Sequence, residues 1–553
     1  MSDRGPGRAP NRGPATGPAT EPATGPDSGD VISIDEFNHA SCARSIFNAL
    51  RDGGAEKIAP DEVIQALADN GLAEGDCRIA ETLAALKTQR RKGPMDLRTF
   101  TGLLHPNNAT LIHRALRGDL IIPDFQTFRF RIGRIFEFAK DYDGGHVADY
   151  IPQLARIDPD LFALGVCTVD GQRFWLGDHD ESYCVQSTCK PINYAIALDT
   201  LGVDVVHRHV GREPSGHGFN ALTLNKDDLP HNPMINAGAI MCASLIKPHL
   251  PMADRFDYVT KVWRSACGGQ KVGFDNAVYH SEKATADRNF ALAYFMSEKG
   301  AFPPDTDLIA TLDFYFQCCS LTTTASQMAV LAGTLANGGI CPVTHKRVFS
   351  SSTVKNCLSL MYSCGMYDFS GEYAFTVGLP AKSGVSGALF IVVPGVCGFA
   401  VWSPRLDRLG NSVRGVEFSR RLVETFAFHT YAGLIEESRL IDPRRTESER
   451  GVDSAVHLCA AGARGDVNEL RRLVASGCDP NRSDYDRRTA LHLAASEGQM
   501  GAVDYLVSHG AAIDCRDRWN NTPLDDARRA GHTKIARFLE AQHSVDTHQS
   551  NKA

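Results

Sequence analysis

The stretch of sequence that decides the fold is Tyr183-Cys-Val-Gln-Ser-Thr-Cys-Lys-Pro-Ile-Asn-Tyr-Ala-Ile-Ala-Leu198. It predicts a turn that leads into an apolar helix, and Pro191 fits the first helical turn because the N–H groups there lack partners. Ser187 and Lys190 are three residues apart, so their side chains share one face of the helix. A lysine that is desolvated by apolar neighbours can lose its proton and activate a serine hydroxyl. The stretch therefore predicts a serine nucleophile with a lysine base.

Two further Ser-x-x-Lys pairs occur, Ser244/Lys247 at an expected helix end and Ser352/Lys355 at a helix start, where Ser351 or Ser352 is more simply a cap. The first pair is distinguished by a second motif later in the chain, Ala381-Lys-Ser-Gly-Val-Ser-Gly387. A Lys-Ser/Thr-Gly box before a strand accompanies Ser-x-x-Lys in the penicillin-recognising serine enzymes and their relatives. Because both boxes occur in this order, we expect the first pair to be catalytic.

Composition and charge exclude several classes of function. The chain has 553 residues and a formal net charge of −7, which predicts about three or four domains and no basic surface for nucleic acid. The longest apolar run, 388–402, is interrupted by Pro394-Gly395 and is too short to span a membrane. We therefore expect neither a nucleic acid nor a membrane as a partner.

The cysteines are not spaced as a metal site or a disulfide framework. The 16 cysteines include no Cys-x-x-Cys pair, and the chain has no His-Glu-x-x-His motif. This pattern gives no support for a zinc site and favours free thiols in a reducing compartment. The adjacent Cys318-Cys319 lies in an apolar segment, so we interpret it as part of the core.

Two segments precede the region that carries the motifs. Residues 1–30 are rich in Pro, Gly, Ala and Thr, which predicts a disordered tail. This tail lacks the apolar block of a secretory signal and the acid-poor pattern of a mitochondrial presequence, which favours a cytoplasmic location. Residues 31–125 predict a helical domain with an EF-hand-like loop. Because Arg51 occupies the first loop position and Lys57 the central glycine position, we predict a degenerate, metal-free module.

Residues 126–440 predict the largest domain, of the α/β (α+β) class. A hairpin pattern at 164–176, with Asp170-Gly171 at its turn, and two strands within 388–402 lie near its two ends. Helices are expected at 252–266, 285–299, 306–318, 323–337, 351–364 and 413–428. We therefore expect a sheet built from both ends of the domain and faced by a cluster of helices.

Residues 452–541 contain a repeat with the spacing of ankyrin repeats. Asp484-Tyr-Asp-Arg-Arg-Thr-Ala-Leu-His-Leu-Ala-Ala495 aligns with Asp517-Arg-Trp-Asn-Asn-Thr-Pro-Leu-Asp-Asp-Ala527 at a period of 33 residues. Such repeats contact only their neighbours and form a short stack. We expect the stack to serve assembly, with binding of a protein partner as the alternative. Residues 542–553 predict a second disordered tail.

The region 126–440 closely resembles the glutaminases of the serine-dependent beta-lactamase-like superfamily. The order of an EF-hand-like helical region, a glutaminase domain and ankyrin repeats is similar to that of the long kidney-type and liver-type enzymes. The motifs that carry the resemblance are Val147-Ala-Asp-Tyr-Ile-Pro-Gln-Leu-Ala155, Cys167-Thr-Val-Asp-Gly-Gln-Arg173, His231-Asn-Pro-Met-Ile-Asn-Ala-Gly-Ala-Ile240, Ser363-Cys-Gly-Met-Tyr-Asp-Phe-Ser-Gly371 and Gly378-Leu-Pro-Ala-Lys-Ser-Gly-Val-Ser-Gly387.

The resemblance implies hydrolysis of L-glutamine to L-glutamate and ammonia through an acyl-enzyme, with no metal or organic cofactor. It implies that Ser187 is the nucleophile and Lys190 its base, and that Tyr367 and Tyr150 complete the catalytic site. The backbone N–H groups of Ser187 and Val385 would form the oxyanion hole. The residues implied to bind the substrate, besides Ser187, Tyr367 and Val385, are Gln186, Asn236, Glu282, Asn289 and Tyr315. A carboxylate suits the substrate's ammonium group, and amides and phenols suit its carboxylate.

The resemblance also implies a homotetramer and, for the long enzymes, activation by phosphate. A Gly-rich loop near the active site takes part in that control, and here it contains His217-Gly-Phe-Asn-Ala-Leu-Thr-Leu224. Kidney-type relatives carry basic residues and a phenylalanine in this segment, whereas Gly218 and Ala221 cannot attract an anion by charge. We therefore predict weak or absent activation by phosphate. The animal members of the family are mitochondrial, so mitochondria are the alternative location.

Two other functions are compatible with parts of the sequence. A penicillin-recognising serine acylase or peptidase shares both boxes, and acylation of Ser187 by a beta-lactam would separate it from an enzyme that releases ammonia from glutamine. The other alternative is a scaffold whose ankyrin repeats bind partners and whose hydrolase domain is inactive. All the motif residues are present, which argues against an inactive domain.

Overall fold

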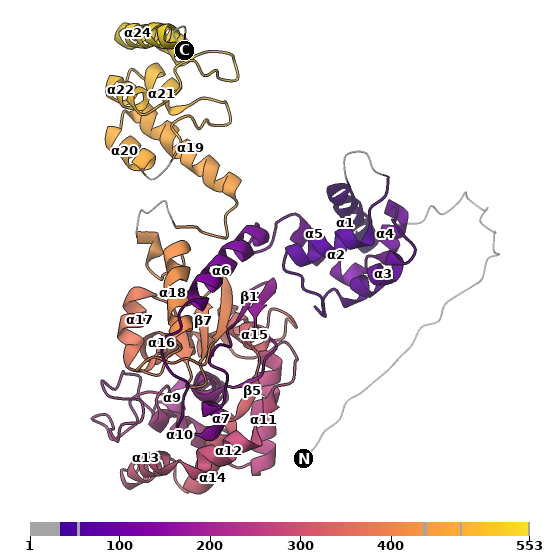
Figure 1. Cartoon of the computed structure of the whole chain (residues 1–553), viewed down its shortest axis with the longest axis vertical. Coiled ribbons are helices and arrows are strands. Elements are labelled where there is room, and N and C mark those ends of the chain that lie inside the picture. Colours follow the sequence, from indigo (N-terminus) through magenta and orange to yellow (C-terminus); the bar gives the residue numbers. More distant parts are fainter. Residues whose placement is uncertain (1–33, 52–55, 435–439, 476–477, 551–553) are drawn as a thin grey trace, which may run out of the picture.

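The computed structural model describes residues 34–51, 56–434, 440–475 and 478–550. The described chain forms an N-terminal helical module, a large domain of helices and sheet, and a C-terminal stack of helices (Figure 1). The disordered tail predicted for 1–30 lies outside these residues.

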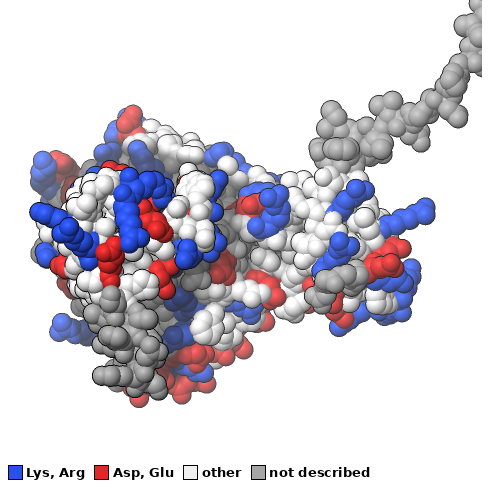
Figure 2. All heavy atoms as spheres, turned by 90° about the horizontal axis from the view of Figure 1, so that it is seen from above, with Lys and Arg blue, Asp and Glu red and all other residues white. Residues whose placement is uncertain are grey.

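None of the helices in the described ranges is both long and apolar enough to cross a membrane. On the face shown in Figure 2, basic and acidic side chains are intermixed, so that face presents no extended basic surface of the kind that nucleic acids bind.

The N-terminal module packs its helices around a small apolar core. The helices are α1 Ile34–Leu50, α2 Pro60–Asp69, α3 Ala80–Arg90, α4 Leu97–Leu103 and α5 Pro106–Leu116. Phe47 and Phe100 meet in the core with their ring centroids 6.2 Å apart. The Asp96 carboxylate accepts the Thr99 N–H and so caps α4. The predicted EF-hand-like pair is α1 and α2, and residues 52–55 of its loop are not among the described residues.

The large domain is built on an antiparallel sheet whose strands come from both ends of the domain. The strand order is β2-β1-β8-β7-β6, with β1 Ala163–Thr168, β2 Arg173–Gly177, β6 Ala381–Ser383, β7 Ala388–Val393 and β8 Cys397–Trp402. β1 pairs with β8 so that Ala163 lies opposite Trp402 and Thr168 opposite Cys397. The predicted sheet is confirmed, and Gly171 at the hairpin turn has the positive φ, 84°, that glycine adopts easily.

Helices cover both faces of this sheet. Helix α15 Ala325–Ala336 lies directly on β1 because Gly165 leaves room for it. A Cβ at Gly165 would come within 2.3 Å of the Ala325 carbonyl oxygen. The opposite face is covered by α6 Phe125–Lys140 and α18 Val413–Thr425, which share an apolar core with alternate residues of the strands. The predicted helix at 413–428 is therefore observed with an earlier end.

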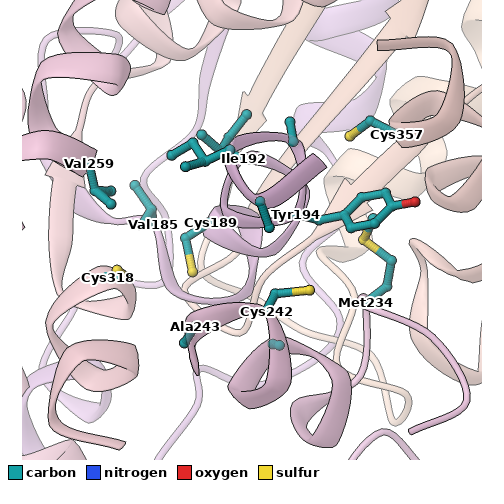
Figure 3. Packing of buried hydrophobic residues seen from close by; sticks show 14 of the residues in the cluster. Val185, Cys189, Ile192, Tyr194, Met234, Cys242, Ala243, Val259, Cys318 and Cys357 are labelled. Carbon is teal, nitrogen blue, oxygen red and sulfur yellow. The ribbon is translucent and has the colours of Figure 1, made fainter. Parts of the chain in front are cut away.

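A second layer of helices packs beyond α15 and carries most of the candidate site. It comprises α8 Lys190–Leu201, α10 Asn236–Leu245, α11 Met252–Ala266, α12 Asn276–Ala284, α13 Asp287–Glu298, α14 Leu308–Cys319 and α16 Ser351–Cys364. Apolar side chains of these helices form one continuous buried cluster (Figure 3). The helix predicted at 285–299 is observed as α13, and α12 before it was not predicted.

Short elements connect the two layers. They are α7 Pro152–Ala155, the 3-10 turn η1 Gln186–Cys189, α9 Val203–Val206, the 3-10 turn η2 Tyr367–Phe369 and α17 Ser370–Thr376. A second sheet, ordered β3-β5-β4, is formed by β3 Tyr183–Cys184, β4 Gly273–Phe274 and β5 Leu321–Thr323. Sequence periodicity did not predict this sheet, because its strands have only two or three residues each.

The C-terminal stack confirms the predicted ankyrin repeats. Its helices are α19 Glu447–Arg464, α20 Val467–Ala475, α21 Ala490–Ser496, α22 Met500–Ser508, α23 Pro523–Arg529 and α24 Thr533–Ser550, after the short 3-10 turn η3 Ala432–Leu434. The repeated threonine opens a helix in two repeats, where Thr489 bonds the His492 ring and Thr522 accepts the Asp525 N–H. Helix α24 extends into 542–553, where a disordered tail was expected, and 551–553 are not described.

A buried cluster of charged groups fixes the N-terminal module to the β1–β2 turn. Arg78 Nη2 lies 2.7 Å from the Asp76 Oδ2, and the same guanidinium donates to the carbonyl oxygens of Asp170 and Gly171 at 2.5 and 2.7 Å. Arg173 of β2 lies 3.0 Å from the same Asp76 oxygen. The turn of the large domain is therefore held by a side chain of the module.

Candidate active site

The Ser-x-x-Lys pair lies where the turn η1 passes into helix α8. Ser187 belongs to η1, and Lys190 is the first residue of α8, so the two side chains lie on the same side of the chain. Lys190 Nζ donates to Ser187 Oγ across 2.6 Å. Burial lowers the pKa of Lys190 below its usual 10.5, which favours the neutral amine that a base requires.

The other two Ser-x-x-Lys pairs are not assembled into dyads. Ser244 Oγ donates to the Met241 carbonyl oxygen, while the Lys247 amine lies over the Tyr258 ring. The third pair lies at the start of α16, where Ser350, rather than the predicted Ser351 or Ser352, caps the helix.

Tyr367 places a buried hydroxyl beside Ser187. Its backbone has a φ of 54°, and its ring lies between Phe219, 4.9 Å away by ring centroids, and Lys382 Nζ, 4.5 Å from the ring centre. Burial raises the pKa of Tyr367, and the neighbouring Ser187 hydroxyl opposes that rise. The hydroxyl satisfies no hydrogen bond of ordinary geometry within the described chain, so it is available to a bound molecule.

Glu282 of α12 forms a carboxylate site next to the serine. Its Oε1 accepts the Tyr150 hydroxyl at 2.5 Å and the Gln186 amide at 2.9 Å. Burial raises the pKa of Glu282, while the hydrogen bonds from Tyr150 and Gln186 and the charge of Lys190 oppose the rise. The Tyr150 side chain is 45% exposed, but desolvation of its hydroxyl and the adjacent Glu282 carboxylate raise its pKa well above the usual value, so the hydroxyl stays a donor.

Three polar side chains from three helices surround Lys190 on its other side. Asn236 of α10 accepts the Lys190 amine at 2.8 Å through Oδ1 and donates through Nδ2 to Asn289 of α13 at 3.1 Å. The Tyr315 hydroxyl of α14 lies 3.4 Å from Asn236 Oδ1, the long end of hydrogen-bond distance. These groups supply amide and phenol donors for an anionic part of a ligand.

The Lys-Ser-Gly box lies against the turn that carries Ser187. A Cβ at Gly384 would be 3.4 Å from the Thr188 N, which shows how closely the two segments pack. Val385 follows directly, and in the described chain its N–H makes no backbone hydrogen bond. The Lys382 amine donates to the Gly365 and Ser383 carbonyl oxygens at 3.1 and 2.6 Å, which joins the box to the turn before Tyr367.

A cavity of about 360 Å³ adjoins Tyr367. Its walls include His217 and Phe219 of the Gly-rich loop and Ser363 and Asp368 of the opposite segment. The Phe219 carbonyl oxygen accepts the Asn236 N–H at 3.0 Å, so the loop is tied to the N-terminal end of α10. The described residues contain no group of three or more His, Cys, Asp or Glu side chains suited to a metal ion.

The structure thus joins most of the predicted side chains through short contacts, and Val385 follows the residue that packs against Thr188. Sequence reasoning did not single out Phe219 or a positioning role for Lys382. The signal for Lys382 was present in the Lys-Ser-Gly box, but its partner Gly365 is a main-chain carbonyl and has no signature in the sequence. Phe219 lies in a loop, where no periodic pattern identifies an inward-facing ring.

Comparison with protein families gives matches over three parts of the chain. The glutaminase family matches residues 145–431, a family of three ankyrin repeats matches 456–551, and an EF-hand family matches 42–123. These ranges follow the same order as the modules predicted from the sequence.

Individual relatives agree with the family matches. The mitochondrial glutaminase liver isoform of Rattus norvegicus is 46% identical over 495 residues, which cover 89% of this chain and 82% of that protein. The liver isoform of Mus musculus shows the same 46% identity and coverage. Among solved structures, the probable glutaminase ybaS has a TM-score of 0.52 and 34% identity, and the match covers 55% of this chain and 98% of that one.

Proposed function

The chain belongs to the glutaminase family and hydrolyses glutamine, and on that premise we propose that Ser187 is the nucleophile and Lys190 its base. The observation that carries the proposal is the 2.6 Å hydrogen bond from Lys190 Nζ to Ser187 Oγ, made by an amine whose pKa is lowered by burial. The penicillin-recognising enzyme and the inactive scaffold are set aside, because glutamine hydrolysis is the activity of the family.

In the first half of the reaction, Lys190 takes the proton of Ser187 as the Oγ attacks the side-chain amide carbon of glutamine. The oxyanion forms between the N–H groups of Ser187 and Val385, and the loss of one such donor typically costs about 10²–10³ in rate. The proton held by Lys190 passes to the leaving nitrogen, directly or through the Tyr367 hydroxyl. Ammonia leaves, and a glutamyl ester remains on Ser187.

In the second half of the reaction, water attacks the ester carbon and the same groups act in reverse. Lys190 accepts the proton of the water, and the proton returns to Ser187 Oγ as glutamate forms. No step needs a metal ion or an organic cofactor.

The amino-acid end of the substrate fits the polar groups around the dyad. Glu282 pairs with the ammonium group, and Tyr150 and Gln186 hold that carboxylate in place. Asn236, Asn289 and Tyr315 surround the substrate carboxylate. The side-chain amide of glutamine then reaches Ser187. Asparagine is one methylene shorter, so its amide does not reach as far.

The experiment that tests the proposal traps the intermediate. The protein is mixed with glutamine, quenched in acid within milliseconds and digested, and the peptide that contains Ser187 is examined for a glutamyl ester by mass spectrometry. Ammonia release from glutamine and from asparagine is measured in parallel. An ester on another residue, or steady ammonia release with no trappable ester, would reject Ser187 as the nucleophile.

We further propose that the protein is a homotetramer in which the ankyrin repeats serve assembly or bind a protein partner. The ankyrin match supports the role of the repeats, and the homotetramer is what the family resemblance implies. Light scattering of the full chain and of a chain that ends at residue 440 tests both parts of the proposal. A monomer in both cases would reject it.

Two further assignments complete the proposal. The boundaries at 31–125, 126–440 and 452–541 are supported by separate apolar clusters in the N-terminal module, the large domain and the stack. For location, the rat and mouse relatives are mitochondrial isoforms, which favours mitochondria over the cytoplasm. Fractionation of cells that express the tagged full-length protein distinguishes the two compartments.

A further inference from the structure

Two buried thiols meet directly behind the Ser187–Lys190 dyad. The Sγ atoms of Cys189 and Cys319 are 3.8 Å apart, and both residues are buried. Cys189 immediately precedes Lys190, and its side chain points into the apolar cluster (Figure 3). Cys319 ends α14, about one helical turn after Tyr315. The pair therefore connects the segment of the nucleophile and base to a helix that lines the substrate site.

This contact is unusual within the protein. All 16 cysteines are free, and Cys189–Cys319 is the one hydrogen bond between two cysteines among the described residues. The described residues offer no third ligand that would make the pair a metal site. Oxidation to a disulfide is the chemistry that two thiols at this separation can undergo.

We propose that Cys189 and Cys319 are a modification site, at which hydrogen peroxide joins the two sulfurs in a disulfide that slows glutamine hydrolysis. Peroxide first oxidises one thiol to a sulfenic acid and is reduced to water. The second thiol then displaces the hydroxyl group, which leaves as a second water when the S–S bond forms. The pair loses two electrons and two protons in total, and a dithiol reductant restores it by exchange.

The surroundings affect how readily the two thiols react. The hydrogen bond with Cys189 and then burial raise the pKa of the Cys319 thiol, so Cys319 keeps its proton. Since both thiols are buried, their oxidation is slower than that of the exposed Cys77, and the sites must be mapped individually.

The disulfide would displace the groups that act on the substrate. A disulfide is about 2.05 Å long, so the sulfurs must approach each other by about 1.8 Å from their present separation. Cys189 is covalently linked to Lys190, and α14 carries Tyr315. A misplacement of about 1 Å in an active site can cost about 10²-fold in rate, so we expect oxidation to lower the activity about a hundredfold.

The full-length protein is treated with hydrogen peroxide, the excess is removed by catalase, and ammonia release from glutamine is compared with that of untreated protein. Non-reducing digestion and mass spectrometry follow the Cys189–Cys319 linkage over the same time course. Cys189→Val and Cys319→Ala remove the pair, and Cys318→Ala is the matched control from the same helix. In Cys319→Ala, dimedone should label a sulfenic acid on Cys189.

We expect activity to fall in step with the linkage in the wild type and in Cys318→Ala, and to return with dithiothreitol. After peroxide treatment, Cys189→Val should release ammonia at the same rate as untreated Cys189→Val. The proposal is overturned if the linkage does not form, if it forms without loss of activity, or if Cys189→Val is inactivated as fast as the wild type. Formation of the linkage in the wild type, followed together with its activity, tests the proposal even if a variant folds poorly. The rate of untreated protein tests the proposed function separately.

Discussion

Lys190 Nζ donates to Ser187 Oγ across 2.6 Å, the contact on which the proposed chemistry depends. We predict that Ser187→Ala lowers ammonia release from glutamine by about 10⁴–10⁶-fold, because serine enzymes that lose their nucleophile fall by this order. Glutamate binding, measured by calorimetry, should persist because the groups around Glu282 are unchanged. Ser244→Ala is the matched control, since Ser244 belongs to a Ser-x-x-Lys pair that is not assembled. Substantial activity in Ser187→Ala would contradict the mechanism.

The protonation state of Lys190 predicts the pH dependence of kcat. Because burial lowers the pKa of this amine below 10.5, kcat should rise as the pH increases through the lowered value and reach a plateau above it. Lys190→Arg should lower kcat by about 10²–10⁴-fold at every pH, since a guanidinium stays protonated and cannot act as a base. Stopped assays of ammonia from acid to alkaline pH test both statements. A kcat that is flat with pH in the wild type would argue against lysine as the base.

Glu282 predicts a separate effect on KM at acid pH. Burial raises the pKa of this carboxyl above 4.5, and its neutral form cannot pair with the substrate ammonium. KM should therefore rise as the pH falls through the raised value, and Glu282→Gln should raise KM at all pH values. Tyr150→Phe removes a hydrogen bond that lowers the pKa, so the rise in KM should move to higher pH.

The control for this prediction is Tyr485→Phe, because Tyr485 is an exposed tyrosine of the ankyrin stack. Its pH profile should match that of the wild type. If Tyr150→Phe leaves the pH dependence of KM unchanged, the hydrogen bond to Glu282 has no role in substrate binding.

The Ser-x-x-Lys pair could be anticipated from the sequence because it is encoded locally. Ser187 and Lys190 lie one turn apart on one segment, so their spacing identifies them, whereas Asn236 was implied only by the family resemblance. The hydrogen bond from Tyr150 to Glu282 spans 132 positions and required the family resemblance.

Other features had no signal in the sequence. The contact of Cys189 with Cys319 and that of Arg78 with the Gly171 carbonyl depend on how elements dock. Periodicity records which face of an element is apolar, but not which element it meets. The strands of the small sheet were missed because strands of two or three residues are too short to show an alternation of apolar and polar side chains.

The Gly-rich loop predicts the response to phosphate. A Cβ at position 218 would lie 4.0 Å from an Asp368 carboxylate oxygen, so this part of the loop faces a negative charge and provides no cation. We expect added phosphate to change the rate less than twofold relative to potassium chloride of equal ionic strength. Light scattering in the same buffers should show an unchanged mass. A several-fold gain in rate specific to phosphate would show that an anion site exists elsewhere.

The cluster of Asp76, Arg78 and Arg173 predicts a pH-dependent contribution to stability. Burial alone would raise the pKa of Asp76, but the hydrogen bonds and charges of Arg78 and Arg173 outweigh it and lower the pKa below 3.8. A carboxyl group whose pKa is lower in the folded protein stabilises the fold at pH values above its pKa in the unfolded chain. This contribution is lost as the pH falls from about 4 through the pKa of the folded state. Arg78→Met leaves the buried Asp76 carboxylate with Arg173 as its one charged partner, beside the backbone N–H of residue 78, and should cost about 3–5 kcal/mol. The control is Arg117→Met, from an exposed ion pair with Asp119, and should cost at most about 1 kcal/mol.

Denaturant unfolding of both variants at pH 7 and pH 3 is the measurement. The two variants should differ clearly at pH 7 and less at pH 3, and equal stability at pH 7 would mean that the cluster does not hold the module to the large domain.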